Sequence, residues 1–210
     1  MPEMTQILCI ETSAETCSVA LTENNKYTLY KESTEPRAHA KVLTVLINEL
    51  LAEANTNIRN LAAVAVSMGP GSYTGLRIGV SAAKGICYAA NIPFISVPTL
   101  AIIAAQYLSQ TSIESNALVV PMMDARRMEI YYAYYNHHLN ELKPATPMVV
   151  DETEFQDLIS RKNIHFIGSG AEKCKPLFNE FDFSFNSSII AHAQNMAQMA
   201  FDKYAVADFS

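Results

Sequence analysis

A glycine-rich turn between two apolar segments narrows the range of folds that this chain can adopt. Residues 64–67 read Val-Ala-Val-Ser, residues 68–77 read Met-Gly-Pro-Gly-Ser-Tyr-Thr-Gly-Leu-Arg, and a largely apolar segment continues to residue 90. The three glycines of the turn allow backbone conformations that other residues resist. The pattern predicts a buried strand, a tight turn and then a helix over residues 75–90, whose small residues permit close packing.

Three known loop classes do not fit this turn. A P-loop ends in Gly-Lys-Ser/Thr, whereas Gly75 is followed by Leu-Arg. A serine-hydrolase elbow needs a glycine two residues before its serine, where this chain has Pro70. A dinucleotide-binding turn needs an acidic residue about 20 residues further on. No Asp or Glu occurs between Glu53 and Glu114, so dinucleotide binding is not expected.

The block Gly-Pro-Gly-Ser-Tyr-Thr-Gly-Leu-Arg-Ile-Gly at residues 69–79 resembles the signature of the TsaB (YeaZ) family. Two further segments agree, Ile-Leu-Cys-Ile-Glu-Thr-Ser at residues 7–13 and Met-Asp-Ala-Arg-Arg-Met-Glu-Ile-Tyr at residues 123–131. The resemblance implies an α/β fold of two tandem ribonuclease H-like domains, as in the actin, sugar kinase and Hsp70 superfamily. We expect these domains at residues 1–110 and 111–210, the second being smaller and its last helix able to pack back on the first.

Composition and charge limit the cellular setting and the partners. Half of the residues are apolar and no apolar stretch approaches the length of a membrane span, so we expect a cytoplasmic globular protein. The four cysteines show no Cys-x-x-Cys spacing and are expected to be reduced core thiols.

The net charge is −6 and the 15 Lys and Arg residues are scattered along the sequence. Direct tRNA binding by this chain alone is therefore not expected, and tRNA would be reached only through a complex.

Apolar runs and turn residues predict the remaining elements. Strands are expected at residues 5–10, 16–21, 27–32, 94–97, 117–123, 129–135 and 164–167. Helices are expected at residues 36–54, at residues 99–108 with Thr99 as the N-cap, at residues 153–159, and from Ser187 or Ser188 to residue 201. Gly168-Ser169-Gly170 is expected to be an ordinary turn from strand to helix.

The helices expected at residues 36–54 and 75–90 are apolar over most of their circumference. A surface helix needs only one apolar stripe, so either these helices are wholly buried or a second face of each meets a partner. The predicted interface residues are His39, Val42, Leu43, Leu46, Leu50, Leu76, Gly79, Ala82, Ala83 and Ile86. The resemblance implies a TsaD-type catalytic subunit and a TsaE-type ATPase as partners, with a homodimer when the chain is alone.

Polar residues after the first expected strand form a second candidate site. The group expected to face an anion or nucleotide is Glu11, Thr12, Ser13, Gly71 and Ser72. By resemblance to the superfamily, the acidic residue at the end of the first strand would hold a metal-bound water. The alternative interpretation is that Glu11 and Thr12 shape the turn through side-chain hydrogen bonds.

Catalytic and metal-binding residues are not expected in this chain. The related TsaD proteins carry a His-x-x-x-His metal pair, and alignment from the glycine turn puts Thr99 and Ile103 at those positions. A threonine and an isoleucine cannot replace two imidazole ligands, and the five histidines elsewhere do not converge in sequence. No cofactor is therefore expected on the chain alone, while ATP or ADP at an interface with a partner is left open.

The function that this sequence predicts is a non-catalytic scaffold subunit. By resemblance, it would serve the complex that transfers a threonylcarbamoyl group to the adenosine next to the anticodon of tRNA. The alternative is a nucleotide-dependent phosphotransferase of the sugar-kinase type that uses Glu11 and Asp124, although Asp124 could equally form an ion pair with Arg126. A metallopeptidase is excluded because the histidine pair is missing.

Overall fold

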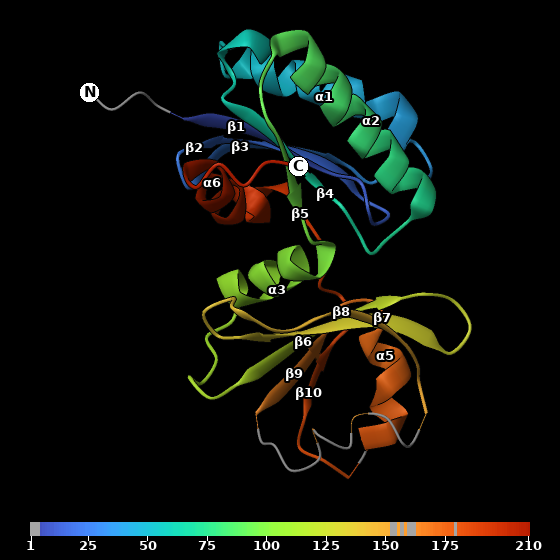
Figure 1. Ribbon diagram of the computed structural model, residues 1–210. Coiled ribbons are helices and arrows are strands. Elements are labelled where there is room, and N and C mark those ends of the chain that lie inside the picture. Colours follow the sequence, from blue (N-terminus) through green and yellow to red (C-terminus); the bar gives the residue numbers. More distant parts are fainter. Residues whose placement is uncertain (1–4, 152–154, 156–157, 159–162, 179) are drawn as a thin grey trace. The chain divides into compact units, whose positions relative to one another are not determined.

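The structure of the protein, a computed structural model, describes residues 5–151, 155, 158, 163–178 and 180–210. The chain divides into two compact units. The first unit comprises Met1–Ile102 and Ala191–Ser210, and the second unit comprises Ile103–Ile190. Each unit is built on one five-stranded sheet (Figure 1).

The sheet of the first unit has the strand order β3-β2-β1-β4-β5. Three antiparallel strands come first in sequence: β1 (Gln6–Glu11), β2 (Cys17–Glu23) and β3 (Lys26–Ser33). Strand β4 (Ala63–Ser67) then pairs in parallel with β1, and β5 (Phe94–Val97) pairs in parallel with β4. The predicted strands of this unit are confirmed to within two residues at each end.

Helices cover both faces of this sheet. Helices α1 (His39–Glu53) and α2 (Tyr73–Ala90) lie on one face, and α6 (Ala197–Ala205) lies on the other with the short 3-10 helix Ala193–Met196 (Figure 1). Because alternate residues of a strand point to opposite faces, Leu8 and Ile10 enter the core beneath α1 and α2. Glu11, the next residue along β1, therefore points to the other face of the sheet.

Both long helices begin at a different residue from the one predicted. Helix α1 begins at His39 and not at residue 36, because Arg37 adopts a positive φ of 58° that interrupts helical geometry. Helix α2 begins at Tyr73, two residues before Gly75. The side chain of Ser72 caps it by accepting a hydrogen bond from the Gly75 amide at 3.2 Å.

The sheet of the second unit repeats the plan of the first. Its antiparallel strands are β6 (Leu118–Asp124), β7 (Glu129–Asn136) and β8 (Glu141–Val149). Strand β9 (Ile164–Ile167) pairs in parallel with β6, and β10 (Ser184–Asn186) pairs in parallel with β9. The strand order of this sheet is β10-β9-β6-β7-β8. Read from the β8 edge, it matches the order of the first sheet, with β6 in the place of β1 and β9 in the place of β4. This repetition confirms the predicted duplicated architecture of two ribonuclease H-like domains.

Helices and aromatic rings complete the second unit. Helix α3 (Thr99–Gln110) contributes its residues from Ile103 onward, and the short helix α5 (Ala171–Cys174) is followed by the 3-10 helix Lys175–Phe178. The core is rich in phenylalanine: the ring of Phe166 is stacked on Phe178 and on Phe185, with centroids 5.2 and 5.1 Å apart. Its packing therefore rests largely on large rigid rings.

Several predicted elements need correction. Strands β8 and β10 were not predicted, and the expected helix at residues 153–159 lies outside the described residues. The final helix does not begin at Ser187 or Ser188, because the Asn186 side chain holds the Ser188 amide in a turn at 3.1 Å and helix α6 starts only at Ala197. Thr99 is not an N-cap either: the Pro98 carbonyl accepts the first helical amides and Thr99 already lies in α3.

All four cysteines are free and buried, as predicted for core thiols. Burial raises the pKa of Cys9 and of Cys174 to about 12 and that of Cys17 to about 11. Among the described residues, no helix has the length and apolar character needed to cross a bilayer.

Candidate functional site

The glycine turn packs directly on the turn that joins β1 to β2. A Cβ atom on Gly75 would stand 2.0 Å from the Thr12 carbonyl oxygen, and one on Gly79 would stand 2.3 Å from Thr12 Oγ1. A Cβ atom on Gly71 would stand 2.6 Å from Ser13 Cβ. Real Cβ atoms do not approach other atoms so closely, so these glycines allow the start of α2 to lie against the first turn.

Three backbone amides of the glycine turn, those of Ser72, Gly75 and Leu76, are paired within the chain. The Ser72 amide donates to the Ser13 carbonyl oxygen at 2.8 Å. The Gly75 amide donates to Ser72 Oγ, and the Leu76 amide donates to the Ser72 carbonyl oxygen at 2.8 Å. An anion-binding turn needs free amides that point at the ligand. These three amides are therefore not available to an anion, which favours a structural role for this part of the glycine turn.

Glu11 lies at the carboxyl end of β1 and is completely buried. Its Oε1 atom accepts hydrogen bonds from the Ser13 amide at 2.5 Å and from Ser67 Oγ at 3.1 Å. Burial raises the pKa of the Glu11 carboxyl, while hydrogen bonds from Ser13, Ser67 and Thr12 act in the opposite direction. Glu11 therefore ties the first turn to the end of β4, which is the turn-shaping behaviour that the second interpretation predicts.

Further buried polar atoms occur at the carboxyl end of this sheet. Those without a hydrogen-bond partner among the described residues are Glu11 Oε2, Thr12 Oγ1, Ser13 Oγ and Thr99 Oγ1. A buried polar atom without a partner destabilises the fold by about 1–3 kcal/mol. Protonation of Glu11 would turn one of these acceptors into a donor, in agreement with the raised pKa of its carboxyl.

Asp124 ends β6 as Glu11 ends β1, but its environment differs. The Asp124 carboxylate accepts hydrogen bonds from Lys173 Nζ at 2.8 Å and from the Arg126 amide at 2.6 Å. Partial burial acts to raise the pKa of Asp124, but the hydrogen bonds from Lys173 and Arg126 and the charge of Lys173 outweigh it, and the pKa is lowered. The ion pair of Asp124 is with Lys173, and the Arg126 guanidinium that the sequence suggested is not its partner.

The Gly-Ser-Gly segment at residues 168–170 is the ordinary strand-to-helix turn that was predicted. Gly168 has a positive φ of 90°, and a Cβ atom there would stand 2.4 Å from the Met122 carbonyl oxygen. Ser169 Oγ accepts a hydrogen bond from the Asp124 amide at 3.1 Å. The turn thus connects β9 to α5 and braces the end of β6.

The structure divides the predicted interface residues into two groups. Leu43, Leu46, Leu50, Gly79 and Ala83 are buried in the chain, while His39, Val42, Leu76, Ala82 and Ile86 are partly exposed. Core residues cannot touch a partner unless the unit rearranges. A surface on α1 and α2 would therefore be formed by the partly exposed group and its exposed neighbours.

Three of these exposed neighbours are large side chains that sequence reasoning missed. Val45 on α1 is 50% exposed, and Tyr73 and Tyr88 on α2 are 75% and 91% exposed. The Arg77 guanidinium lies over the Tyr73 ring, 5.4 Å from its centroid. Residues 73, 77, 84 and 88 follow the helical period, so this stripe could have been found from the sequence by looking for large residues outside the buried face.

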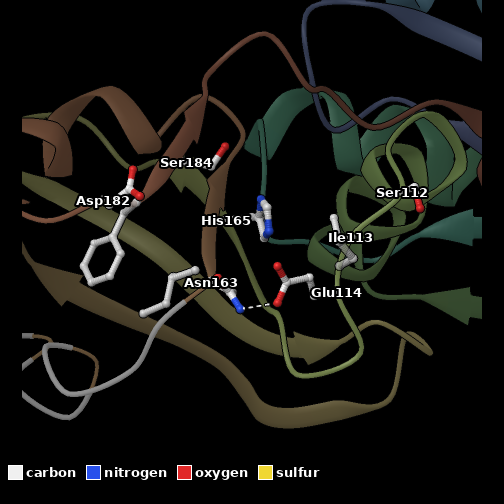
Figure 2. Close-up of a pocket in the computed structure, with 9 residues that line it drawn as sticks. Ser112, Ile113, Glu114, Asn163, His165, Asp182 and Ser184 are labelled. Carbon is white, nitrogen blue, oxygen red and sulfur yellow. Dashed lines mark hydrogen bonds between the residues drawn. The ribbon is translucent and has the colours of Figure 1, made fainter.

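The second unit contains a pocket of about 460 Å³ that the sequence did not predict (Figure 2). Its lining residues are Ser112, Ile113, Glu114, Asn163, Ile164, His165, Asp182, Phe183 and Ser184. The Asn163 side chain donates to Glu114 at 2.6 Å, and the Tyr107 hydroxyl lies 2.9 Å from His165 Nδ1. Burial lowers the pKa of His165, and the charge of Glu114 opposes this shift.

Metal ligands do not converge in this pocket or elsewhere in the described part of the chain. No group of three or more His, Cys, Asp or Glu side chains there could hold a metal ion. Thr99 and Ile103, at the positions aligned with the histidine pair, are both buried in α3. The polar pocket can therefore accept hydrogen-bonding groups, but it presents no metal-binding set among the described residues.

Comparison with known families places this chain beside proteins that are named for tRNA modification. The sequence model of the family described as "TsaD: tRNA N6-adenosine threonylcarbamoyltransferase" matches residues 24–209. The chain is 34% identical over 137 residues to the tRNA threonylcarbamoyladenosine biosynthesis protein TsaB of Escherichia coli. That match covers 64% of this chain and 57% of the relative, so the chain spans little more than half of the relative's length.

Solved structures agree with this placement. YeaZ from Pseudomonas aeruginosa is 25% identical, with a TM-score of 0.85 and coverage of 99% of this chain and 95% of that one. The activator of the 2-hydroxyisocaproyl-CoA dehydratase from Clostridium difficile is 8% identical with a TM-score of 0.53, covers 97% of each chain and supports the fold alone. The glycine-turn signature, the duplicated sheet plan and these matches agree, and the chain belongs to the TsaB (YeaZ) family.

Proposed function

We propose that this chain is a non-catalytic scaffold subunit in the biosynthesis of threonylcarbamoyladenosine in tRNA. In this role it binds a TsaD-type subunit that transfers the threonylcarbamoyl group to the adenosine next to the anticodon. A TsaE-type ATPase assists the complex, and the chain alone forms a homodimer. Such a complex would act in the cytoplasm, and ATP or ADP would be held at the interface with a partner and not by this chain alone.

The observation that carries this proposal is the pair of helices α1 and α2 on one face of the first sheet. Their inward residues fill the core, and their outward faces still carry exposed Val45, Tyr73 and Tyr88. Tyrosine is enriched in protein interfaces, and large side chains left exposed on two adjacent helices are in agreement with an association surface. A partner helix pair on this surface would complete a four-helix arrangement.

The geometry of the glycine turn argues against the phosphotransferase alternative. A kinase of this superfamily needs space and free amides for a phosphate beside the first turn. Here the Ser72 amide already bonds to Ser13, and the Gly75 backbone leaves no space beside Thr12. Glu11 is fully buried and uses Oε1 within the chain. These contacts support the scaffold function over phosphate transfer.

The decisive experiment compares partner binding with ATP turnover. The purified chain is mixed with a TsaD-type subunit and the mixture is separated by size-exclusion chromatography with light scattering. We expect a stable complex, threonylcarbamoylation of tRNA only when both subunits are present, and no ATP turnover by the isolated chain above a blank. Turnover by the isolated chain without association with the TsaD-type subunit would overturn the proposal.

A further inference from the structure

The hairpin between β6 and β7 presents two arginines in an unfavourable backbone conformation. Arg126 and Arg127 both have positive φ values, 72° and 44°. Side chains with a Cβ atom disfavour this region, and glycine, asparagine or aspartate normally occupy it. Two consecutive arginines there are held by their surroundings, and such positions gather at functional sites.

A network of contacts holds this hairpin tip in place. The Ala125 amide donates to the Glu129 carbonyl oxygen, and the Glu129 amide donates to the Arg126 carbonyl oxygen, both at 3.0 Å. Lys173 Nζ joins the two sides of the tip, because it donates to Asp124 Oδ1 at 2.8 Å and to the Glu129 carbonyl oxygen at 3.1 Å. The tip is therefore braced from α5 and does not depend on its own sequence preference.

Both arginine side chains of the braced tip are exposed. Among the described residues no carboxylate lies within ion-pair distance of either guanidinium, and Asp124, two residues before Arg126, is already paired with Lys173. Glu129 follows in β7 with its side chain exposed, so the tip carries two positive charges against one negative charge. The hairpin tip therefore presents two solvent-exposed positive charges on a backbone held in place, in a chain whose net charge is −6.

We propose that Arg126 and Arg127 contact backbone phosphates of the tRNA in the assembled complex. This inference rests on the proposed function. Guanidinium groups bind phosphate oxygens through paired N–H donors, and a backbone fixed in advance reduces the ordering cost of binding. Tyr131, two residues beyond Glu129 and 38% exposed, offers a ring on which an unpaired base can stack. Two contacts are too few for this chain to bind tRNA alone, in agreement with its acidic net charge.

The test measures tRNA binding by the complex of this chain with a TsaD-type subunit. A labelled tRNA transcript is titrated at salt concentrations from 50 to 200 mM, and the logarithm of the binding constant is plotted against the logarithm of salt. For Arg126→Gln with Arg127→Gln, the loss of two phosphate contacts should reduce the slope by about 1.4–1.8 and weaken binding about 15- to 30-fold at 0.15 M salt. Arg126→Lys with Arg127→Lys keeps both charges and should keep the wild-type slope.

A matched control removes two exposed cations elsewhere in the chain. Lys26→Gln with Arg59→Gln changes the net charge by the same amount and should leave the slope unchanged. If the tip variant binds tRNA with the wild-type slope and affinity, the inference is overturned. If it weakens association with the TsaD-type subunit but leaves the slope intact, the tip meets an acidic protein surface and the inference is equally overturned. A wild-type complex that neither binds nor modifies tRNA refutes the proposed function itself, which is a separate result.

Discussion

Gly75 lies so close to Thr12 that a Cβ atom on residue 75 would stand 2.0 Å from the Thr12 carbonyl oxygen. This contact joins the first turn of α2 to the end of β1. A Cβ atom on Gly85, in the same helix, would meet nothing within 4 Å outside its own stretch of helix. The two glycines therefore serve different purposes, and a matched pair of substitutions can separate them.

Gly75→Ala is expected to destabilise the first unit, because the added methyl group must displace backbone and cannot be accommodated by a side-chain rotation. Overpacking of this kind costs about 3 kcal/mol. Gly85→Ala removes a flexible residue from a helix interior and should stabilise the chain by about 0.5–1 kcal/mol. Urea unfolding followed by circular dichroism measures both values. Equal effects of the two substitutions would contradict the close contact with Thr12.

Glu11→Gln should change how stability depends on pH. The pKa of Glu11 is raised in the folded chain, so the folded state holds this proton more tightly than the unfolded state does. The free energy of unfolding is then highest below the unfolded-state pKa and falls as the pH rises through the folded-state pKa. A glutamine cannot ionise, so this decline should become smaller.

The amide side chain introduced by Glu11→Gln can still accept from Ser13 and Ser67, and it adds a donor among the buried acceptors. We expect the variant to be more stable than the wild type by about 1 kcal/mol at pH 8. Glu49→Gln, an exposed change on α1, is the control and should alter stability by less than about 0.5 kcal/mol. A decline with pH as steep as that of the wild type would show that Glu11 is not responsible for it.

Val45→Glu and Leu46→Glu test the association surface and the core separately. Val45 is 50% exposed, so a glutamate there should leave the free energy of unfolding within about 0.5 kcal/mol of the wild type. It should nevertheless weaken binding to a TsaD-type subunit by about 2 kcal/mol, since it puts an unpaired charge into an apolar interface.

Leu46, which was predicted to be an interface residue, is only 8% exposed and belongs to the core beneath α1. A glutamate there should destabilise the fold by about 3–5 kcal/mol, whatever the partner does. Chemical denaturation and pull-down with the partner distinguish the two effects. Normal partner binding by a folded Val45→Glu variant would move the interface away from this part of α1.

Ala207→Gly should stabilise the end of α6. The Asp208 amide donates to the Lys203 carbonyl oxygen at 2.9 Å and the Ala207 amide to that of Tyr204 at 3.1 Å, which is the pattern of a Schellman motif. Ala207 occupies its left-handed position with a φ of 56°, where glycine is preferred. Thermal unfolding should show a gain of about 1 kcal/mol, whereas Ala205→Gly inside α6 should cost about 0.5–1 kcal/mol. A loss of stability in Ala207→Gly would contradict the assignment of this motif.

The strands and helices with strong local patterns could be predicted from the sequence. The apolar runs of the first unit predicted strands within two residues of their observed ends, because each is bounded by turn residues. Strand β8 escaped prediction because Pro144 and Pro147 interrupt its pattern, and an edge strand tolerates proline. The short β10 carries too few residues for any periodicity to appear.

The candidate sites were less predictable because they depend on contacts between distant residues. The Asp124 carboxylate pairs with Lys173 and not with its sequence neighbour Arg126, and only the packing of α5 on the sheet reveals this choice. Because α1 is apolar over most of its circumference, its pattern likewise could not separate Leu46, which is buried, from Val45, which is exposed. Two adjacent residues of a helix face directions about 100° apart, and the position of the sheet decides which of them enters the core.

The return of residues 191–210 to the first unit has a consequence for biosynthesis. Helix α6 covers the face of the first sheet opposite to α1 and α2, and it is synthesised only after the whole of the second unit. At about 5–20 residues per second, the ribosome takes roughly 4 to 18 s to make residues 103–190. During that time the first five strands leave the exit tunnel with one apolar face of their sheet uncovered. The nascent chain therefore presents a temporary surface for chaperones. Its first unit can complete folding only after the second unit has been translated.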